Sequence, residues 1–162
     1  MAAEYSAIAN QNILPGQPMI FQDSPVPNDY GYIFHRDGSG IFRLASRTNR
    51  IFGGCCKCCR RLLESQYRIS FGANVAIPEG GAIEPITMAL AIDGVIDQAS
   101  LMEVTPAAVG QYWNIGTDII IAVPSICRCE TVSVVNAGTA ATGIDARNGT
   151  IIIEPLRVSF AA

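Results

Sequence analysis

Cysteine is the residue type with the most chemical potential in this 162-residue chain, because a thiolate can form a disulfide, bind a metal or act as a nucleophile. The six cysteines form two groups, one within residues 53–61 and one within residues 127–129. The run Cys-Cys-Lys-Cys-Cys contains the C-x₂-C spacing of zinc sites but is not specific for it, so disulfides, a structural zinc site and reduced thiols all stay open, with disulfides favoured. The candidate metal ligands are Cys55, Cys56, Cys58, Cys59, Cys127 and Cys129.

Thiol catalysis would also need a histidine within hydrogen-bond reach of a cysteine. The chain has one histidine, His35, in the segment YIFHRDG, and nothing in the sequence brings it to either cysteine group. We expect His35 to be a solvated residue of a strand. With no catalytic constellation identified, we predict that the chain is not an enzyme, and no cofactor other than the zinc alternative is indicated.

The remaining polar candidates have simpler interpretations. Asp93 and Asp97 could bind calcium, but Asp-Gly is ordinary hairpin-turn chemistry. Glu79 and Glu84 bracket a Gly-Gly turn and are expected to be solvated rather than an acid/base pair. The sequence Asn-Gly-Thr at 148–150 satisfies the glycosylation pattern. None of these is expected to be a functional centre.

The elements that would position these residues are β-strands, because apolar residues alternate with period two. The clearest case spans 66–77, and similar patterns predict strands at 86–92, 119–123 and 131–136. The last strand, at about 150–160, is apolar on both sides at 151–153 and is expected to be irregular at Pro155 and covered on both faces. Shorter strands are predicted at 17–23 and 30–46, with a hairpin turn at 37–40. We predict an all-β, two-sheet antiparallel jelly-roll sandwich of about eight to ten strands.

Composition limits the functional classes. Hydrophobic residues make up 49% and charged residues 15% of the chain, which suits one folded domain with part of its surface hidden in an oligomer. A net charge of -3 provides no basic face for nucleic acid. No apolar run approaches the ~18 residues of a membrane span, and the start of the chain lacks a signal-peptide pattern. Residues 1–16, polar and small, are expected to be an N-terminal arm, or a frayed terminus, before a domain at 17–162.

The strands, taken in order, carry a resemblance. The segments GSGIFRL, YRISFGANVAIP, ITMALAIDGVI, TDIIIAVPSICRCETVSVVNAG and TIIIEPLRV cover much of residues 17–160. This pattern resembles the tumour necrosis factor and complement globular-head family of trimeric jelly rolls. It is most similar to the C-terminal domains of exosporium collagen-like glycoproteins and to the knobs of phage head fibres. A collagen-like Gly-x-y repeat is absent, which weakens the exosporium alternative.

The resemblance implies a homotrimer that packs through the sheet containing the YRIS, TDIIIAV and terminal strands. It also implies that both cysteine groups lie at one end of the sandwich, and Tyr112 and Trp113 are expected to cap the core or the trimer contact. The implied interface residues are Tyr67, Ile69, Phe71, Ile119, Ile121, Ile151 and Ile153.

The function implied is that of a structural virion protein, a bacteriophage capsid decoration or head-fibre module. It would be made in the host cytoplasm, lie on the virion surface and dock to a capsid or other surface-layer protein through the N-terminal arm. The alternatives are a spore or cell-surface protein of the exosporium type and a lectin-like module that uses the loops of residues 93–114.

Overall fold

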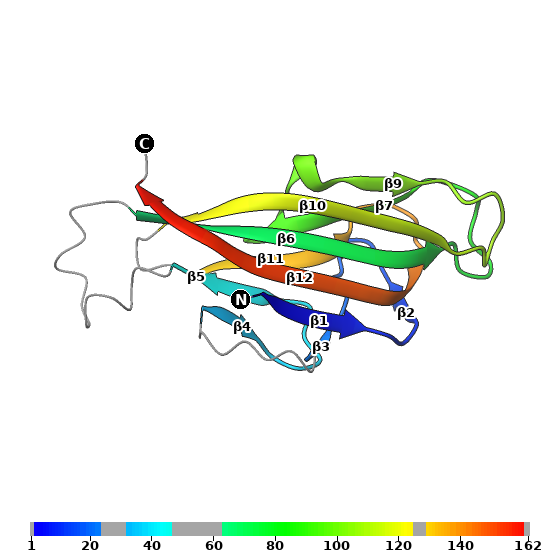
Figure 1. Cartoon of the computed structure of the whole chain (residues 1–162). Helices are drawn as coiled ribbons and strands as arrows, with labels where there is room; N and C mark the ends of the chain where they lie inside the picture. Colours follow the sequence, from blue (N-terminus) through cyan, green and yellow to red (C-terminus); the bar gives the residue numbers. More distant parts are fainter. Residues whose placement is uncertain (1, 24–31, 47–62, 125–128, 161–162) are drawn as a thin grey trace.

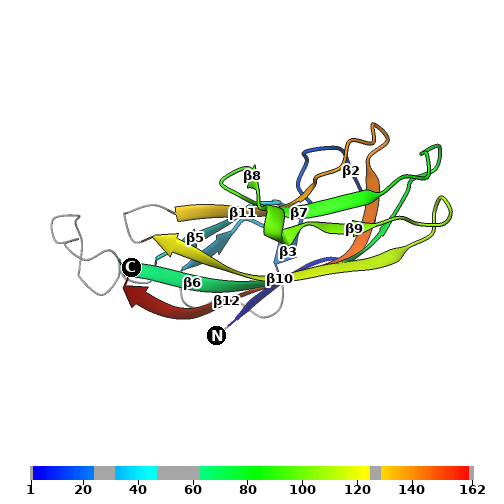
Figure 2. The same ribbon diagram turned by 90° about the horizontal axis from the view of Figure 1, so that it is seen from above.

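Two antiparallel sheets packed face to face form the protein (Figures 1 and 2). The computed structural model describes residues 2–23, 32–46, 63–124 and 129–160. The first sheet has the order β10 (Trp113–Pro124), β6 (Leu63–Ala76), β12 (Ile144–Phe160), β1 (Ala3–Ala7) and β3 (Gln22–Asp23), and β2 (Gln11–Ile13) also pairs with β12. The second has the order β4 (Ile33–His35), β5 (Phe42–Ala45), β11 (Cys129–Asn136), β7 (Ile86–Ile92) and β8 (Val95–Ile96), and β9 (Met102–Val104) also pairs with β7.

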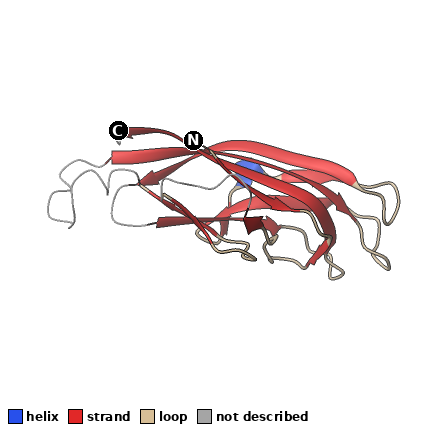
Figure 3. Ribbon diagram, turned by 60° about the horizontal axis from the view of Figure 1, so that its bottom comes forward, coloured by secondary structure: helices blue, strands red, loops and turns tan. Residues whose placement is uncertain are grey.

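This architecture confirms the predicted all-β sandwich of the jelly-roll kind. The long strands predicted from alternation are present, and the described residues hold more strands than expected because β1, β2, β8 and β9, each five residues long or shorter, were not predicted. The one helical element among the described residues is the 3₁₀ turn η2 (Gln98–Ser100), visible in Figure 3. None of the described helical structure is long and apolar enough to cross a membrane.

The core lies between the two sheets and is built from the inward side of each alternating strand. All six predicted inward residues of the segment 66–77 are buried, namely Tyr67, Ile69, Phe71, Ala73, Val75 and Ile77. Met88 and Leu90 on β7, and Val132 and Val134 on the neighbouring β11, are fully buried, and Leu90 is paired with Val134. Since full burial of one such side chain is worth about 1.5–3 kcal/mol, this interior is the main source of stability.

An aromatic cluster fills the part of the core below β4 and β5. Phe42 lies with its ring centroid 5.5 Å from that of Phe21 and 4.9 Å from that of Tyr5. The His35 ring stacks on Phe42 at 4.6 Å, and its Nε2 is 3.0 Å from the Ser39 carbonyl oxygen. Because a carbonyl only accepts hydrogen bonds, Nε2 is the donor. The prediction of a solvated histidine is therefore wrong: His35 is half-buried, since its strand lies at the margin of this cluster.

The N-terminal segment belongs to the sandwich, which corrects the expected arm at residues 1–16. β1 pairs with β12 from Ala3↔Ile153 to Ala7↔Gly149, and Ala3, Tyr5 and Ala7 are buried. The alternation is real, but two of its three inward residues are alanines. Small side chains give a weak hydrophobic signal in sequence, whereas in the sheet they fit against neighbouring strands.

The terminal strand β12 is an interior strand of the first sheet, paired with β6 on one side and with β1 and β2 on the other, and it contains two irregularities. One lies between Pro155 and Val158, as expected for a proline that cannot donate a ladder hydrogen bond. The other lies at residues 147–150, where Asn148 has a φ of 51° and a Cβ on Gly149 would lie 2.4 Å from the Met19 Cε atom. The glycosylation pattern thus coincides with a bulge at which Asn148 is exposed, and a larger residue at Gly149 would require the end of the Met19 side chain to move.

Candidate assembly face on the first sheet

The outer face of the first sheet is the broad surface presented by β10, β6 and β12 (Figure 1). Residues paired across β10, β6 and β12 form rows, here called rungs. Two rungs lie on this face, Asp118–Ser70–Ile152 and Ile120–Arg68–Glu154. The rung between them, Ile119–Ile69–Ile153, points into the core. Because successive side chains of a strand point to opposite faces, the two outer rungs face solvent. We call these six residues the assembly face.

Apolar side chains are exposed on this face. Ile120 is 63% exposed and Ile152 is 37% exposed, and Leu156 farther along β12 is 39% exposed. Scattered exposed isoleucines are common on proteins, but these lie on strands separated by only one strand. The expectation that β12 is covered on both sides at 151–153 is thus not met within one protomer, since Ile152 is open to solvent.

An ion pair crosses the middle of the assembly face. The Arg68 Nε donates to Asp118 Oδ1 at 2.9 Å and to Oδ2 at 3.1 Å, and Arg68 Nη2 also donates to Oδ2. Ser70 Oγ donates to Asp118 Oδ1 at 3.1 Å. The hydrogen bonds from Arg68 hold the pKa of Asp118 below its usual value, with a smaller contribution from Ser70, and the same pairing raises the pKa of Arg68. The two charges therefore satisfy each other within one protomer.

The residues predicted for the trimer interface do not lie on this face. All seven point into the protomer's own core, and Tyr67, Ile69, Ile151 and Ile153 are fully buried there. The Tyr67 hydroxyl even donates across the sandwich to the carbonyl oxygen of Ala45 on β5. These side chains are therefore used within one protomer, because alternation identifies the buried face of a strand but not whether it packs on the same chain or on another.

The cysteine-bearing segments connect strands that end at one end of the sandwich. In the first sheet Pro124 is paired with Glu64 and Phe160 with Leu63, while in the second Cys129 is paired with Ala45. The expected convergence is confirmed for these flanking strands. Cys55, Cys56, Cys58, Cys59 and Cys127, with the loop 53–61, lie outside the described residues. Cys129 is half-buried with a free thiol, and no group of three potential ligands gathers in the described part of the chain.

The two aspartates considered for calcium serve separate turns. Asp93 Oδ1 accepts hydrogen bonds from Thr131 N at 2.7 Å and from Thr131 Oγ1 at 3.0 Å. Asp97 Oδ1 accepts one from Ala99 N at 3.2 Å and caps η2. Glu79 is exposed and Glu84 half-buried, on the loop before β7. The Asp97 carboxylate thus fixes its own turn, whereas the Asp93 carboxylate ties the β7–β8 turn to Thr131 on β11.

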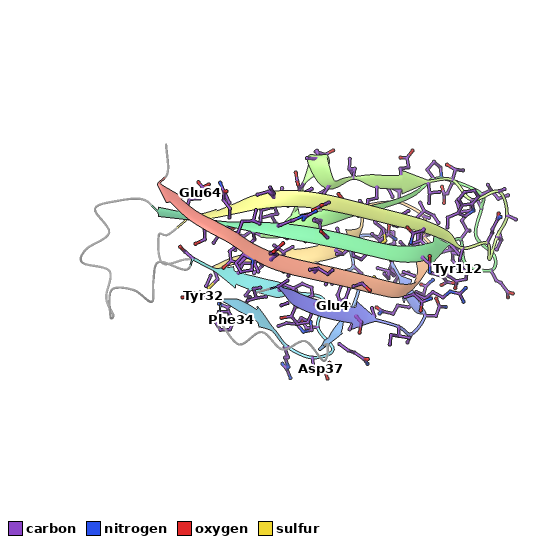
Figure 4. The ribbon with its side chains drawn as sticks, viewed as in Figure 1. Glu4, Tyr32, Phe34, Asp37, Glu64 and Tyr112 are labelled. Carbon is purple, nitrogen blue, oxygen red and sulfur yellow. The ribbon has the colours of Figure 1, made fainter. Side chains whose placement is uncertain are left out.

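The aromatic pair Tyr112 and Trp113 lies at the opposite end of the first sheet from Glu64 (Figure 4, which labels Tyr112 and Glu64). The Tyr112 hydroxyl donates to Asn10 Oδ1 at 3.1 Å, and the Arg147 guanidinium carbon lies 3.6 Å from the centre of its ring. Trp113 is 43% exposed at the start of the edge strand β10 and does not cap the core, so the trimer contact stays the prediction for it. This corner is held by polar and cation–π contacts.

Sequence reasoning missed the outward residues of the assembly face. The signal was present: Ile120 lies between two inward isoleucines of one strand, and Ile152 does so in another. An isoleucine on the solvent side of an alternating strand indicates an additional contact, and three consecutive isoleucines occur in both strands.

Comparison with known proteins adds no family. No protein-family model matches the chain, and no curated protein matches it. The function has therefore to be inferred from the residues of the chain's own surface.

Proposed function

We propose that the chain is a non-enzymatic structural protein that forms a homotrimer through the assembly face and works as a capsid decoration or head-fibre module of a bacteriophage. The observation that supports this most directly is the placement of exposed Ile120 and Ile152 around the Arg68–Asp118 pair on a rigid three-stranded surface. Apolar surface removed from water at about 25 cal/mol per Å² would drive the association.

The ion pair is compatible with a covered face. Burying a charge is costly when the charge has no partner. In a bidentate ion pair with further hydrogen bonds, the interactions within the pair offset most of the lost hydration. Asp118 already accepts from both Arg68 and Ser70 in the protomer. A second subunit could therefore cover this pair without leaving either charge unpaired.

The virion role is supported by the strand-pattern resemblance to phage head-fibre knobs and by the jelly-roll architecture. A charged content of 15% also suits a surface that is largely covered in an assembly. Because β1 is integrated into the first sheet, attachment to a capsid or other surface-layer protein is assigned to a surface other than an N-terminal arm.

The trimer is tested by native mass spectrometry and by light scattering after gel filtration at micromolar concentration. We expect a species of three times the 17.3-kDa chain mass. Ile120→Glu should shift it to the monomer, because an added carboxylate would be buried on this face while the neighbouring Arg68 is already paired with Asp118. The matched control is Ile83→Glu, which is 58% exposed on the loop before β7 and should remain trimeric. A monomeric wild-type chain would overturn the proposal.

The virion assignment has its own test. Antibodies to the purified chain should label the surface of intact phage particles in electron micrographs and detect the chain in particles purified by density gradient. Detection only on spores or cell surfaces would favour the exosporium alternative. Binding to neutral glycans through residues 93–114 would favour the lectin alternative, for which exposed Val95 and Val109 are the first positions to substitute.

A further inference from the structure

A groove is formed on the outside of the second sheet by the β4–β5 hairpin. It is an open hollow with a volume of about 290 Å³, just below the range of typical small-molecule sites. Its lining consists of Phe34, His35, Arg36, Ser39, Ile41 and Arg43. Figure 4 labels Phe34 at this hairpin, well away from Tyr112 at the far end of the molecule. The groove is separate from the assembly face, which lies on the other sheet.

The walls of the groove are fixed by hydrogen bonds to Ser39. Its carbonyl oxygen accepts from Phe21 N at 3.0 Å and from His35 Nε2 at 3.0 Å. Its Oγ accepts from Ile41 N at 3.0 Å. The His35 ring in turn rests on the buried Phe42. The groove is therefore preorganised by the core, which lowers the entropic cost of binding a ligand.

Two guanidinium groups give the groove a positive charge in a chain of net charge -3. Arg43 on β5 lies directly across from Phe34 on β4, and Arg36 begins the turn that closes on Ser39. Neither arginine has an ion-pair partner among the described residues. Guanidinium groups bind carboxylate and phosphate through paired hydrogen bonds, so these two side chains suit an anionic group.

The same groove has an apolar side. Phe34 and Ile41 are each 49% exposed, and both line it. An aromatic ring can pack against the C–H face of a flat or cyclic ligand while neighbouring polar groups orient it. The Ser39 hydroxyl hydrogen makes no bond among the described residues, so it can donate to a ligand oxygen. A ring with hydroxyl groups and one anionic substituent matches these three features together.

We propose that the β4–β5 groove binds an acidic sugar, with its carboxylate or phosphate between Arg36 and Arg43 and its ring against Phe34. The groove is open on one side, so it can accept the terminal residue of a longer polysaccharide. This proposal does not depend on trimer formation or on a virion role, because every residue named belongs to one protomer's second sheet or the turn that joins its strands.

The test is titration of the full chain with glucuronic acid, glucose 6-phosphate, glucose and inorganic phosphate, monitored by calorimetry and by chemical-shift changes. We expect both acidic sugars to bind, glucose to bind at least tenfold more weakly, and affinity to fall as salt rises. Preference for one acidic sugar over the other identifies the anionic group. Equal affinity for glucose and glucuronic acid would overturn the proposal.

Variants assign the binding to this groove. The double substitution Arg36→Gln with Arg43→Gln should weaken glucuronic acid binding at least tenfold. The substitution Arg147→Gln should leave it unchanged, because this exposed arginine lies against Tyr112, which Figure 4 places far from Phe34. Phe34→Ala should weaken the binding of the acidic sugars but not the binding of inorganic phosphate. If phosphate binds as tightly as the acidic sugars and Phe34→Ala affects neither, the sugar assignment is wrong. If the double variant binds glucuronic acid as tightly as the wild type, the proposed binding site in this groove is wrong.

Discussion

The assembly face and the β4–β5 groove both display arginine, but in opposite states. On the assembly face Arg68 is paired with Asp118, and the surrounding surface is flat sheet with exposed isoleucines. In the groove Arg36 and Arg43 have no ion-pair partner among the described residues and line a hollow. A charge that is already paired can be covered by a protein surface, whereas charges without a partner favour an anion. This difference is why we propose the first surface for subunit contact and the second for a ligand.

The largest expected effect is on the free energy of unfolding. It tests whether the groove is supported by core side chains that stabilise the fold, whereas the assembly face is made of side chains that the fold does not need. Phe42→Ala should lower the free energy of unfolding by about 3–5 kcal/mol, because it removes a fully buried ring that contacts Tyr5, Phe21 and His35. Ile152→Ala should change it by less than about 1 kcal/mol in the monomer. Urea unfolding monitored by circular dichroism measures both, and equal losses would contradict the distinction.

A smaller effect on stability is expected where the groove's turn meets the core. A Cβ added to Gly40 would lie 2.7 Å from the Met19 carbonyl oxygen and 2.7 Å from Pro18 Cβ. Gly40→Ala should therefore cost about 1–3 kcal/mol and weaken acidic-sugar binding, because the turn must shift. The control Ile41→Ala changes a neighbouring exposed side chain and should leave stability nearly unchanged. If Gly40→Ala has the same free energy of unfolding as the wild type, the close packing of Gly40 against Met19 and Pro18 is not needed for stability.

The paired charges of the assembly face can be separated from each other. Asp118→Leu alone should weaken trimer formation, since it leaves Arg68 covered without a partner, whereas the double variant Asp118→Leu with Arg68→Met should restore association. Sedimentation velocity across a concentration series measures the change. If the single variant associates as well as the wild type, the pair lies outside the interface.

The smallest expected effect is on the pKa of Asp118 and on the pH-dependent stability that this residue contributes. Because Arg68 lowers its pKa in the folded state, Asp118 contributes stability that is present above the unfolded value of about 3.9 and is lost as pH falls through the lower folded pKa. Carboxyl chemical shifts of the monomeric Ile120→Glu variant, with and without Arg68→Gln, should show the Asp118 pKa rising when Arg68 is removed. Arg147→Gln in the same background is the control. An unchanged pKa after removal of Arg68 would contradict the pairing.

The sequence was most informative where side-chain size and alternation coincide. Tyr67, Ile69 and Phe71 gave the inward face of β6 correctly, and Pro155 marked a real irregularity. It was least informative where the pattern is made of small residues, as in β1, whose inward Ala3 and Ala7 carry little hydrophobic signal. His35 was misassigned because its burial depends on Phe42, a residue of the next strand.

By itself, the sequence determined the class of fold and the inward face of the long strands, because period-two alternation is a local property of the chain. Only the tertiary structure decided what those faces pack against, which outward isoleucines share a surface, and that Arg68 is paired while Arg36 and Arg43 line a groove. These outcomes depend on strand order and register, which join residues as distant as Arg68 and Asp118. The alternation of a single strand carries no information about its neighbours.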